Sequence, residues 1–235
     1  MTEANNIQWK RLSTEAAAII ASILLAFAID AWWEERVDRD TLESQLRSLA
    51  NEFDQNHQVL KRYIDLHEAS VDGTESLITH LHAVEHNTPA TVPAELIALS
   101  IRMPTFDPSS GSYDALLTSG HLAKIRNHEL QSALAAWRGH VADATEDEIN
   151  AINLIENRLL PYLNPIVPMA PMFDYRIGPG FEGPQPNSVS LDRTTQLENL
   201  LGRRRQHGVL AAAALNRLLN LLEQIQRLLV EELAS

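Results

Sequence analysis

One apolar stretch near the N-terminus constrains this chain more than any other feature. Residues 16–29 carry no charged side chain, and tryptophans flank them at Trp9, Trp32 and Trp33. Trp9 and Trp32 lie 23 positions apart, which is about 35 Å along an α-helix. The hydrocarbon layer of a bilayer is about 30 Å thick, and tryptophan is enriched at its two edges. The stretch therefore predicts one membrane-spanning helix.

The same stretch also fits two other kinds of segment. An apolar core of 14 residues would by itself suit a buried helix of a soluble protein. The triplet Ala26-Phe27-Ala28 fits the small-x-small pattern of signal-peptide cleavage. Glu15 interrupts the start of the apolar region, which opposes cleavage, and the tryptophans favour a span. We expect a retained anchor.

The basic residues around the span say little about its direction. Lys10 and Arg11 precede the span, whereas Arg36 and Arg39 follow it among four acidic residues, so a count of basic residues is nearly even. A short N-terminal tail more often stays inside than crosses. We therefore expect the bulk of the chain on the non-cytoplasmic side.

Composition excludes several classes of function. The 235-residue chain has a formal net charge of −12, whereas a nucleic-acid-binding protein normally needs a basic patch to neutralise phosphates. The chain has no cysteine, which excludes disulfides, zinc-thiolate sites, iron-sulfur ligation and thiol nucleophiles. We expect no nucleic-acid partner.

The helical pattern continues beyond the predicted span. Apolar side chains alternate at spacings of four and three from Leu42 to His67, with no proline or glycine before Gly73. Such a seam suits a parallel coiled coil between subunits or one wall of an intramolecular bundle. Asn56 and His67 occupy seam positions, which weakens a leucine-zipper interpretation, so the sequence favours the bundle.

Further helices are predicted along the rest of the chain, and the predicted fold class is all-α. Gly120 is expected in the left-handed conformation after a short helix, and Asn127 is expected to cap the start of a long one. A break is predicted in the last helical region at 206–208, beside the basic run 203–205, which we interpret as a solvated turn. The expected helices cover 75–86, 94–103, 112–117, 127–160 and 192–233.

Four parts follow from these patterns. They are a tail and anchor (1–36), a long-helix bundle (37–160), a proline-rich arm (161–191) and C-terminal helices that pack on the bundle (192–235). Seven of the eleven prolines fall between Pro161 and Pro186, and we expect no regular helix there. The apolar side chains of this arm must pack on the bundle or contact a partner: Ile166, Met169, Met172, Phe173, Tyr175 and Phe181.

Two stretches resemble a group of bacterial proteins of unknown function that have an N-terminal single-pass helix. The first is Ile23–Arg36, ILLAFAIDAWWEER, in which an apolar run closes in tryptophan and a charged cluster. The second is Ser112–Leu122, SYDALLTSGHL, which is similar to the group's Ser-Gly-x-Leu turn. The resemblance implies a helical, membrane-anchored domain, and it supplies no activity. Together with the orientation expected above, we expect the protein in the bacterial inner membrane with its bulk on the periplasmic side.

One short motif suggests a zinc peptidase. His82-Ala83-Val84-Glu85-His86 fits the H-x-x-E-H pattern, in which two histidines on one helical face bind zinc and a glutamate acts as base. Glu156 is the favoured downstream candidate for a third ligand. The alternative is that the histidines only complement the C-terminal end of a helix, and this alternative is favoured. We expect no metal and no cofactor.

Ionisable residues within a span suggest function. Glu15 and Asp30 lie at the two ends of the apolar run, where solvation at the membrane interface is the favoured interpretation and a buried hydrogen bond to a neighbouring helix is the alternative. Ala17, Ala21 and Ala28 would let a neighbouring helix approach closely. We therefore expect a lateral partner. The predicted membrane and partner contacts are these residues, the tryptophans Trp9, Trp32 and Trp33, and the apolar residues of the proline-rich arm.

The sequence thus predicts a non-catalytic accessory or structural subunit that docks on a larger membrane protein complex, respiratory or photosynthetic. The alternative is an extracytoplasmic ligand-sensing or signalling module. The peptidase is the remote alternative. A homo-oligomer stays open.

Overall fold

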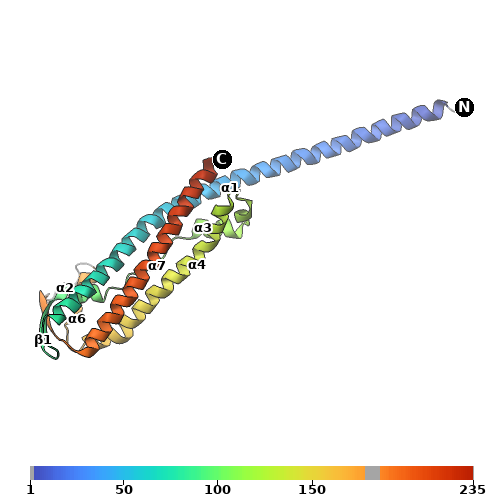
Figure 1. Ribbon diagram of the computed structural model, residues 1–235. Helices are drawn as coiled ribbons and strands as arrows, with labels where there is room; N and C mark the ends of the chain where they lie inside the picture. The colour runs from blue at the N-terminus through green and yellow to red at the C-terminus, as the bar shows by residue number, and fades with distance from the viewer. Residues whose placement is uncertain (1–2, 178–185, 235) are drawn as a thin grey trace.

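A computed structural model describes residues 3–177 and 186–234, and it describes only the backbone of 3–11, 13, 14 and 174–177. The protein is mostly helical, with 81% of its residues in helices, so the all-α fold class is confirmed in this coarse form. Figure 1 shows one very long helix that projects from a body of packed helices. The elements in chain order are α1 (Glu3–His82), β1 (Pro89–Pro93), α2 (Ala94–Ser100), α3 (Gly111–Thr118), η1 (His121–Lys124), α4 (His128–Leu154), η2 (Ile155–Leu159), α5 (Leu160–Leu163), α6 (Met169–Ile177), β2 (Ser188–Asp192) and α7 (Thr195–Ala234).

Helix α1 is continuous over 80 residues, about 120 Å at 1.5 Å per residue. Its first half stands free, and its second half packs along α7 and α2 and contacts α4 through the Phe53 and Trp137 rings (Figure 1). We expected it to end near Gly73, with a separate helix over 75–86, and that prediction is wrong. A Cβ at Gly73 would lie 2.5 Å from the Cβ of Leu99 in α2. The glycine thus serves close helix packing and does not end the helix.

Helix α7 is also continuous, so the predicted break at 206–208 is wrong. A Cβ at Gly208 would lie 2.7 Å from Cγ2 of Val71, because α7 passes very close to α1 at this level. The two helices run antiparallel, as the contacts of His57 with Glu223 and of Arg205 with Glu75 show. Both predicted breaks were therefore glycines at helix crossings.

The segment that joins α2 to α4 is held by hydrogen bonds to polar side chains of the long helices α1 and α7. Glu52 of α1 accepts hydrogen bonds from the amides of residues 112 and 113, at 2.6 and 3.1 Å. The Asn56 amide pairs with both backbone groups of Ser109, and Glu232 of α7 accepts from the amides of 126 and 127. Gly120 is left-handed (φ 74°), and Asn127 caps α4, so both of these predictions are confirmed.

The proline-rich segment is more regular than expected. Helix α6 lies within it, contrary to the prediction of no regular helix, because Pro171 occupies the helix's first turn, where its missing N–H costs little. Helix α4 ends in one π-type turn, η2, ahead of Pro161. Strands β1 and β2 pair antiparallel, with Ala90 opposite Leu191. Neither strand is predicted from the sequence.

Two apolar clusters fill the body. The first lies toward the point where α1 leaves the body and includes Phe53, Leu60, Trp137 and Leu222. The second lies at the far end, where the strands are, and includes Leu81, Ile97, Ile155 and Leu201. Buried polar side chains separate these two clusters.

Candidate functional site

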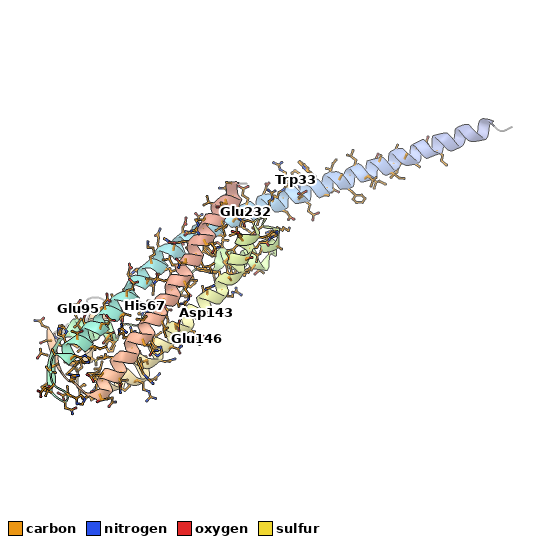
Figure 2. All side chains as sticks on the ribbon, in the orientation of Figure 1. Trp33, His67, Glu95, Asp143, Glu146 and Glu232 are labelled. Carbon is orange, nitrogen blue, oxygen red and sulfur yellow. The ribbon has the colours of Figure 1, made fainter. Side chains whose placement is uncertain are left out.

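The free half of α1 is the first candidate site. Within the part of the chain that the structure describes, α1 is the one helix long and apolar enough to cross a membrane, and its most apolar window is entirely exposed. Phe27 is 66% exposed and Leu24 63%, which is unlike a core helix of a soluble protein. Figure 2 shows Trp33 close to the place where α1 leaves the body. The anchor predicted from the sequence is therefore supported by its exposure.

The span residues predicted from the sequence share this exposure. Glu15, Ala17, Ala21, Ala28, Asp30, Trp32 and Trp33 are all exposed. The rings of Trp32 and Trp33 lie 6.5 Å apart, and the Arg36 guanidinium lies 5.8 Å from the Trp32 ring. The predicted contact of Trp9 falls outside the described side chains, as do those of Tyr175 and Phe181.

The body begins immediately beyond the tryptophans. Lys124 of η1 forms an ion pair with Asp38 at 2.5 Å, and this hydrogen bond lowers the pKa of the Asp38 carboxyl. His121 Nδ1 lies 2.8 Å from the Gln45 amide oxygen. Asp38 is five residues after Trp33, or about 8 Å along the helix. A membrane edge at Trp33 would thus lie against η1.

Three of the predicted contact side chains of the proline-rich arm pack within the protein. Met172 is fully buried and Met169 is 8% exposed, both in the second apolar cluster, and Phe173 packs partly buried against it. Ile166 is 48% exposed and lies in an open groove of about 470 Å³ beside the π-type turn. Of the predicted contact residues in this arm whose side chains are described, Ile166 is the most available to a partner.

The zinc motif lacks the geometry on which its interpretation depends. Helix α1 ends at His82, so Glu85 and His86 lie in the following turn and the two histidines share no helical face. His82 pairs with Glu198 at 3.1 Å, and His86 lies 3.0 Å from the Thr195 hydroxyl. Over residues 3–177 and 186–234, no group of three histidine or acidic residues is assembled for a metal ion.

A second candidate site lies between the two apolar clusters, and we call it the polar layer. Its six side chains are all at least 98% buried: His67, Ser70 and Thr74 of α1, Ser100 of α2, Glu148 of α4 and Arg204 of α7. Figure 2 shows His67 where α1, α4 and α7 lie together.

His67 and Glu148 form the acidic half of the polar layer. His67 Nε2 lies 3.1 Å from Oε1 of Glu148. The backbone N–H of Phe106 donates to both carboxylate oxygens, at 3.1 and 3.2 Å. His67 Nδ1 has no hydrogen-bond partner among the described residues. The imidazole and the carboxylate are thus in direct contact within the core.

Arg204 forms the basic half of the polar layer. It donates to the carbonyl oxygens of Ser100 (2.8 Å) and Arg102 (3.0 Å) and to the Ser70 hydroxyl. No carboxylate pairs with it in the described part of the chain, and desolvation lowers its pKa to about 10. The prediction of a solvated turn over 203–205 is wrong for Arg204, because the turn is helix α7 and this side chain faces inward.

Glu148 and Arg204 are not predicted from the sequence as buried residues, although their spacing from apolar neighbours places both on a buried helix face. Leu197, Leu201, Arg204, Gly208 and Ala211 follow each other at four and three residues, and all are buried. Trp137, Ala144, Glu148 and Ala151 lie likewise on one buried face of α4.

No family model, curated protein or solved structure matches this chain. The resemblance to single-pass bacterial proteins therefore stays a prediction.

Proposed function

We propose that this protein is a non-catalytic accessory subunit, anchored by α1 and docked laterally on a larger membrane protein complex. One observation carries the proposal: a single helix is exposed throughout its N-terminal apolar run, residues 16–29, and buries one face where it enters the body. An exposed run this apolar is rare on a soluble monomer and needs a cover. A bilayer and a neighbouring membrane helix supply that cover.

The body is suited to brace a complex at the membrane surface. It meets α1 at Asp38, one to two turns beyond Trp33, and α1 is held from there by packing that starts at Leu42 and Leu46. The anchor and the body are thus joined by continuous helix and not by a flexible linker. We place the body on the periplasmic side of a bacterial inner membrane, with an energy-converting complex, respiratory or photosynthetic, as the host.

Mild-detergent extraction of native membranes tests this function. The full chain is captured through a C-terminal tag, and co-purifying proteins are quantified by mass spectrometry. We expect one membrane complex at fixed stoichiometry. A control replaces residues 16–31 by a leucine helix of equal length, which keeps the anchor and removes its specific faces. Recovery of the protein alone, or equal recovery with the control, would contradict lateral docking.

The polar layer favours a second candidate function, an extracytoplasmic sensing module. Helix α1 carries both the span and His67, which is 34 residues beyond Trp33, about 51 Å. A conformational change at the His67–Glu148 pair could therefore be transmitted to the membrane along one continuous helix, α1.

A spin label tests the second candidate. The label is placed at Val37→Cys, an exposed position on α1 close to the membrane edge. For a sensing module, Glu148→Gln changes the mobility of this label, whereas Glu146→Gln, an exposed neighbour on the same helix, does not. Equal label spectra for both variants would contradict the sensing function.

A further inference from the structure

A small pocket opens on the body between α3 and α4. Its volume is about 190 Å³, and its walls come from residues between 107 and 114 and from residues between 137 and 141 of α4. Pockets for drug-sized ligands measure about 300–1,000 Å³, so this one suits a small ligand. It shares no residue with the anchor or with the polar layer.

Trp137 brings an unpaired hydrogen-bond donor to this pocket. The side chain is 2% exposed, and its ring packs against that of Phe53 in the first apolar cluster. No described residue accepts a hydrogen bond from its indole N–H, although a buried tryptophan usually finds an acceptor. The Nε1 atom is not enclosed either, so it reaches the surface at the pocket that Trp137 lines. An oxygen of a ligand can therefore supply the acceptor.

The pocket also carries charges of both signs. Arg138 Nη2 donates to Oδ1 of Asp114 at 2.5 Å, which uses one of the five N–H donors of a guanidinium. No other described residue accepts from this guanidinium. Asp107 is exposed, and no described residue pairs with its carboxylate. The pocket thus offers further cationic donors and one unpaired carboxylate.

Contacts within the body hold the walls of the pocket in place. The Tyr113 hydroxyl donates to the Leu134 carbonyl at 2.9 Å, which ties α3 to α4. The Arg138 guanidinium lies 5.8 Å from the centre of the Tyr113 ring. The Asn56 amide pairs with both backbone groups of Ser109 in the loop before α3. A site that is already ordered loses little conformational entropy when a ligand binds.

We propose that this pocket binds a small aliphatic α-amino acid. The ligand carboxylate accepts hydrogen bonds from the Trp137 N–H and the Arg138 guanidinium, and the ligand ammonium pairs with Asp107. Charge-assisted hydrogen bonds of this kind are about twice as strong as neutral ones. Pro108 and Val141 offer apolar contacts to a short side chain.

A zwitterion suits the pocket better than an ion of one sign. A carboxylate alone would leave Asp107 without a counterion, and an amine alone would leave the Trp137 N–H without an acceptor. The inference goes beyond the proposed docking function and does not depend on whether α1 spans a membrane.

Isothermal titration calorimetry of the full chain in dodecyl maltoside tests the proposal. The probes are glycine, L-alanine, L-valine and L-leucine, titrated one at a time. We expect one site with a Kd of about 1 mM or lower for at least one of them. The tightest of the four is then compared with two analogues, one without the amino group and one without the carboxylate. Each analogue should bind at least tenfold more weakly.

Variants distinguish a ligand site from a structural role. Asp107→Asn should bind the amino acid at least tenfold more weakly, and no better than the analogue without the amino group. Trp137→Phe keeps the ring and removes the N–H, and Arg138→Gln removes the guanidinium. Both should shrink the preference over the analogue without the carboxylate. Asp143→Asn, at an exposed position of α4 (Figure 2), is the matched control and should bind like the wild type.

Three results would overturn the proposal: no binding of any of the four amino acids, equal affinity for the amino acid and either analogue, or equal affinities of Asp107→Asn and Asp143→Asn. Asp107 is exposed, so its variant keeps the test valid even where circular dichroism shows that Trp137→Phe does not fold. Co-purification with a membrane complex does not involve this pocket, so the docking function and the ligand site fail separately.

Discussion

Removal of the Glu148 carboxylate should destabilise the body strongly, because two buried groups lose their partner. Glu148 is 1% exposed and accepts from the Phe106 amide and from His67. In Glu148→Ala, each group left unpaired costs about 1–3 kcal/mol, and breaking a buried pair costs about 3–5 kcal/mol in total. We expect a loss of about 3–5 kcal/mol in the free energy of unfolding. Glu148→Gln keeps an acceptor for Phe106 and should lose about 1–2 kcal/mol.

The assay is urea unfolding of the full chain in dodecyl maltoside, followed by far-ultraviolet circular dichroism and extrapolated linearly to zero urea. Glu146→Ala is the matched control, since it makes the same chemical change on an exposed face of α4, two residues away (Figure 2). It should change stability by less than about 0.5 kcal/mol. A loss below about 1 kcal/mol for Glu148→Ala, or equal losses for both variants, would refute the reasoning about the polar layer.

Three further predictions concern glycines, a helix cap and an acidic pH transition. Gly73→Ala should lower the melting temperature, because its Cβ would lie 2.5 Å from the Cβ of Leu99. Gly139→Ala should raise the melting temperature, because its Cβ meets nothing within 4 Å. Calorimetry measures both variants, and equal shifts in melting temperature would refute the packing argument. Asn127→Ala removes a side chain that accepts two amide hydrogen bonds at the start of α4 and should cost about 0.5–2 kcal/mol in urea unfolding, so an unchanged midpoint would contradict the cap. The pKa of Glu198 is lowered below its ordinary 4.5 in the folded protein, chiefly by a hydrogen bond from Arg193. The contribution of Glu198 to folding stability is therefore present above pH 4.5 and is lost as the pH falls through the pKa of the folded state. The stability difference between wild type and Glu198→Gln should accordingly shrink between pH 6 and pH 3, and a constant difference would refute this.

The long helices could be predicted from the sequence because their apolar spacing is local. The seam from Leu42 to His67, the Asn127 cap and the left-handed Gly120 all follow from patterns within a few residues. The errors at Gly73 and Gly208 have one physical cause. Whether a glycine ends a helix or admits a neighbour depends on Leu99 and Val71, which come from distant parts of the chain.

The strands and the polar layer required long-range information. Strands β1 and β2 are five residues each and pair across about a hundred positions of sequence. Glu148 and Arg204 stand at core positions by spacing, but a charged side chain is placed inside only when partners for its hydrogen bonds are known. Those partners lie on other elements, at His67, Ser70 and Ser100.

The central claim is that α1 crosses a membrane and enters the body as one uninterrupted helix. Single cysteines introduced at each position from 20 to 45 of this cysteine-free chain can carry spin labels in reconstituted vesicles. Their accessibility to oxygen and to a water-soluble nickel complex measures depth and helical period together. The account predicts oxygen-accessible labels through residue 31, nickel-accessible labels on the outward face beyond residue 36, and one 3.6-residue period throughout. Nickel access at residues 20–28, or loss of the period between 33 and 41, would contradict it.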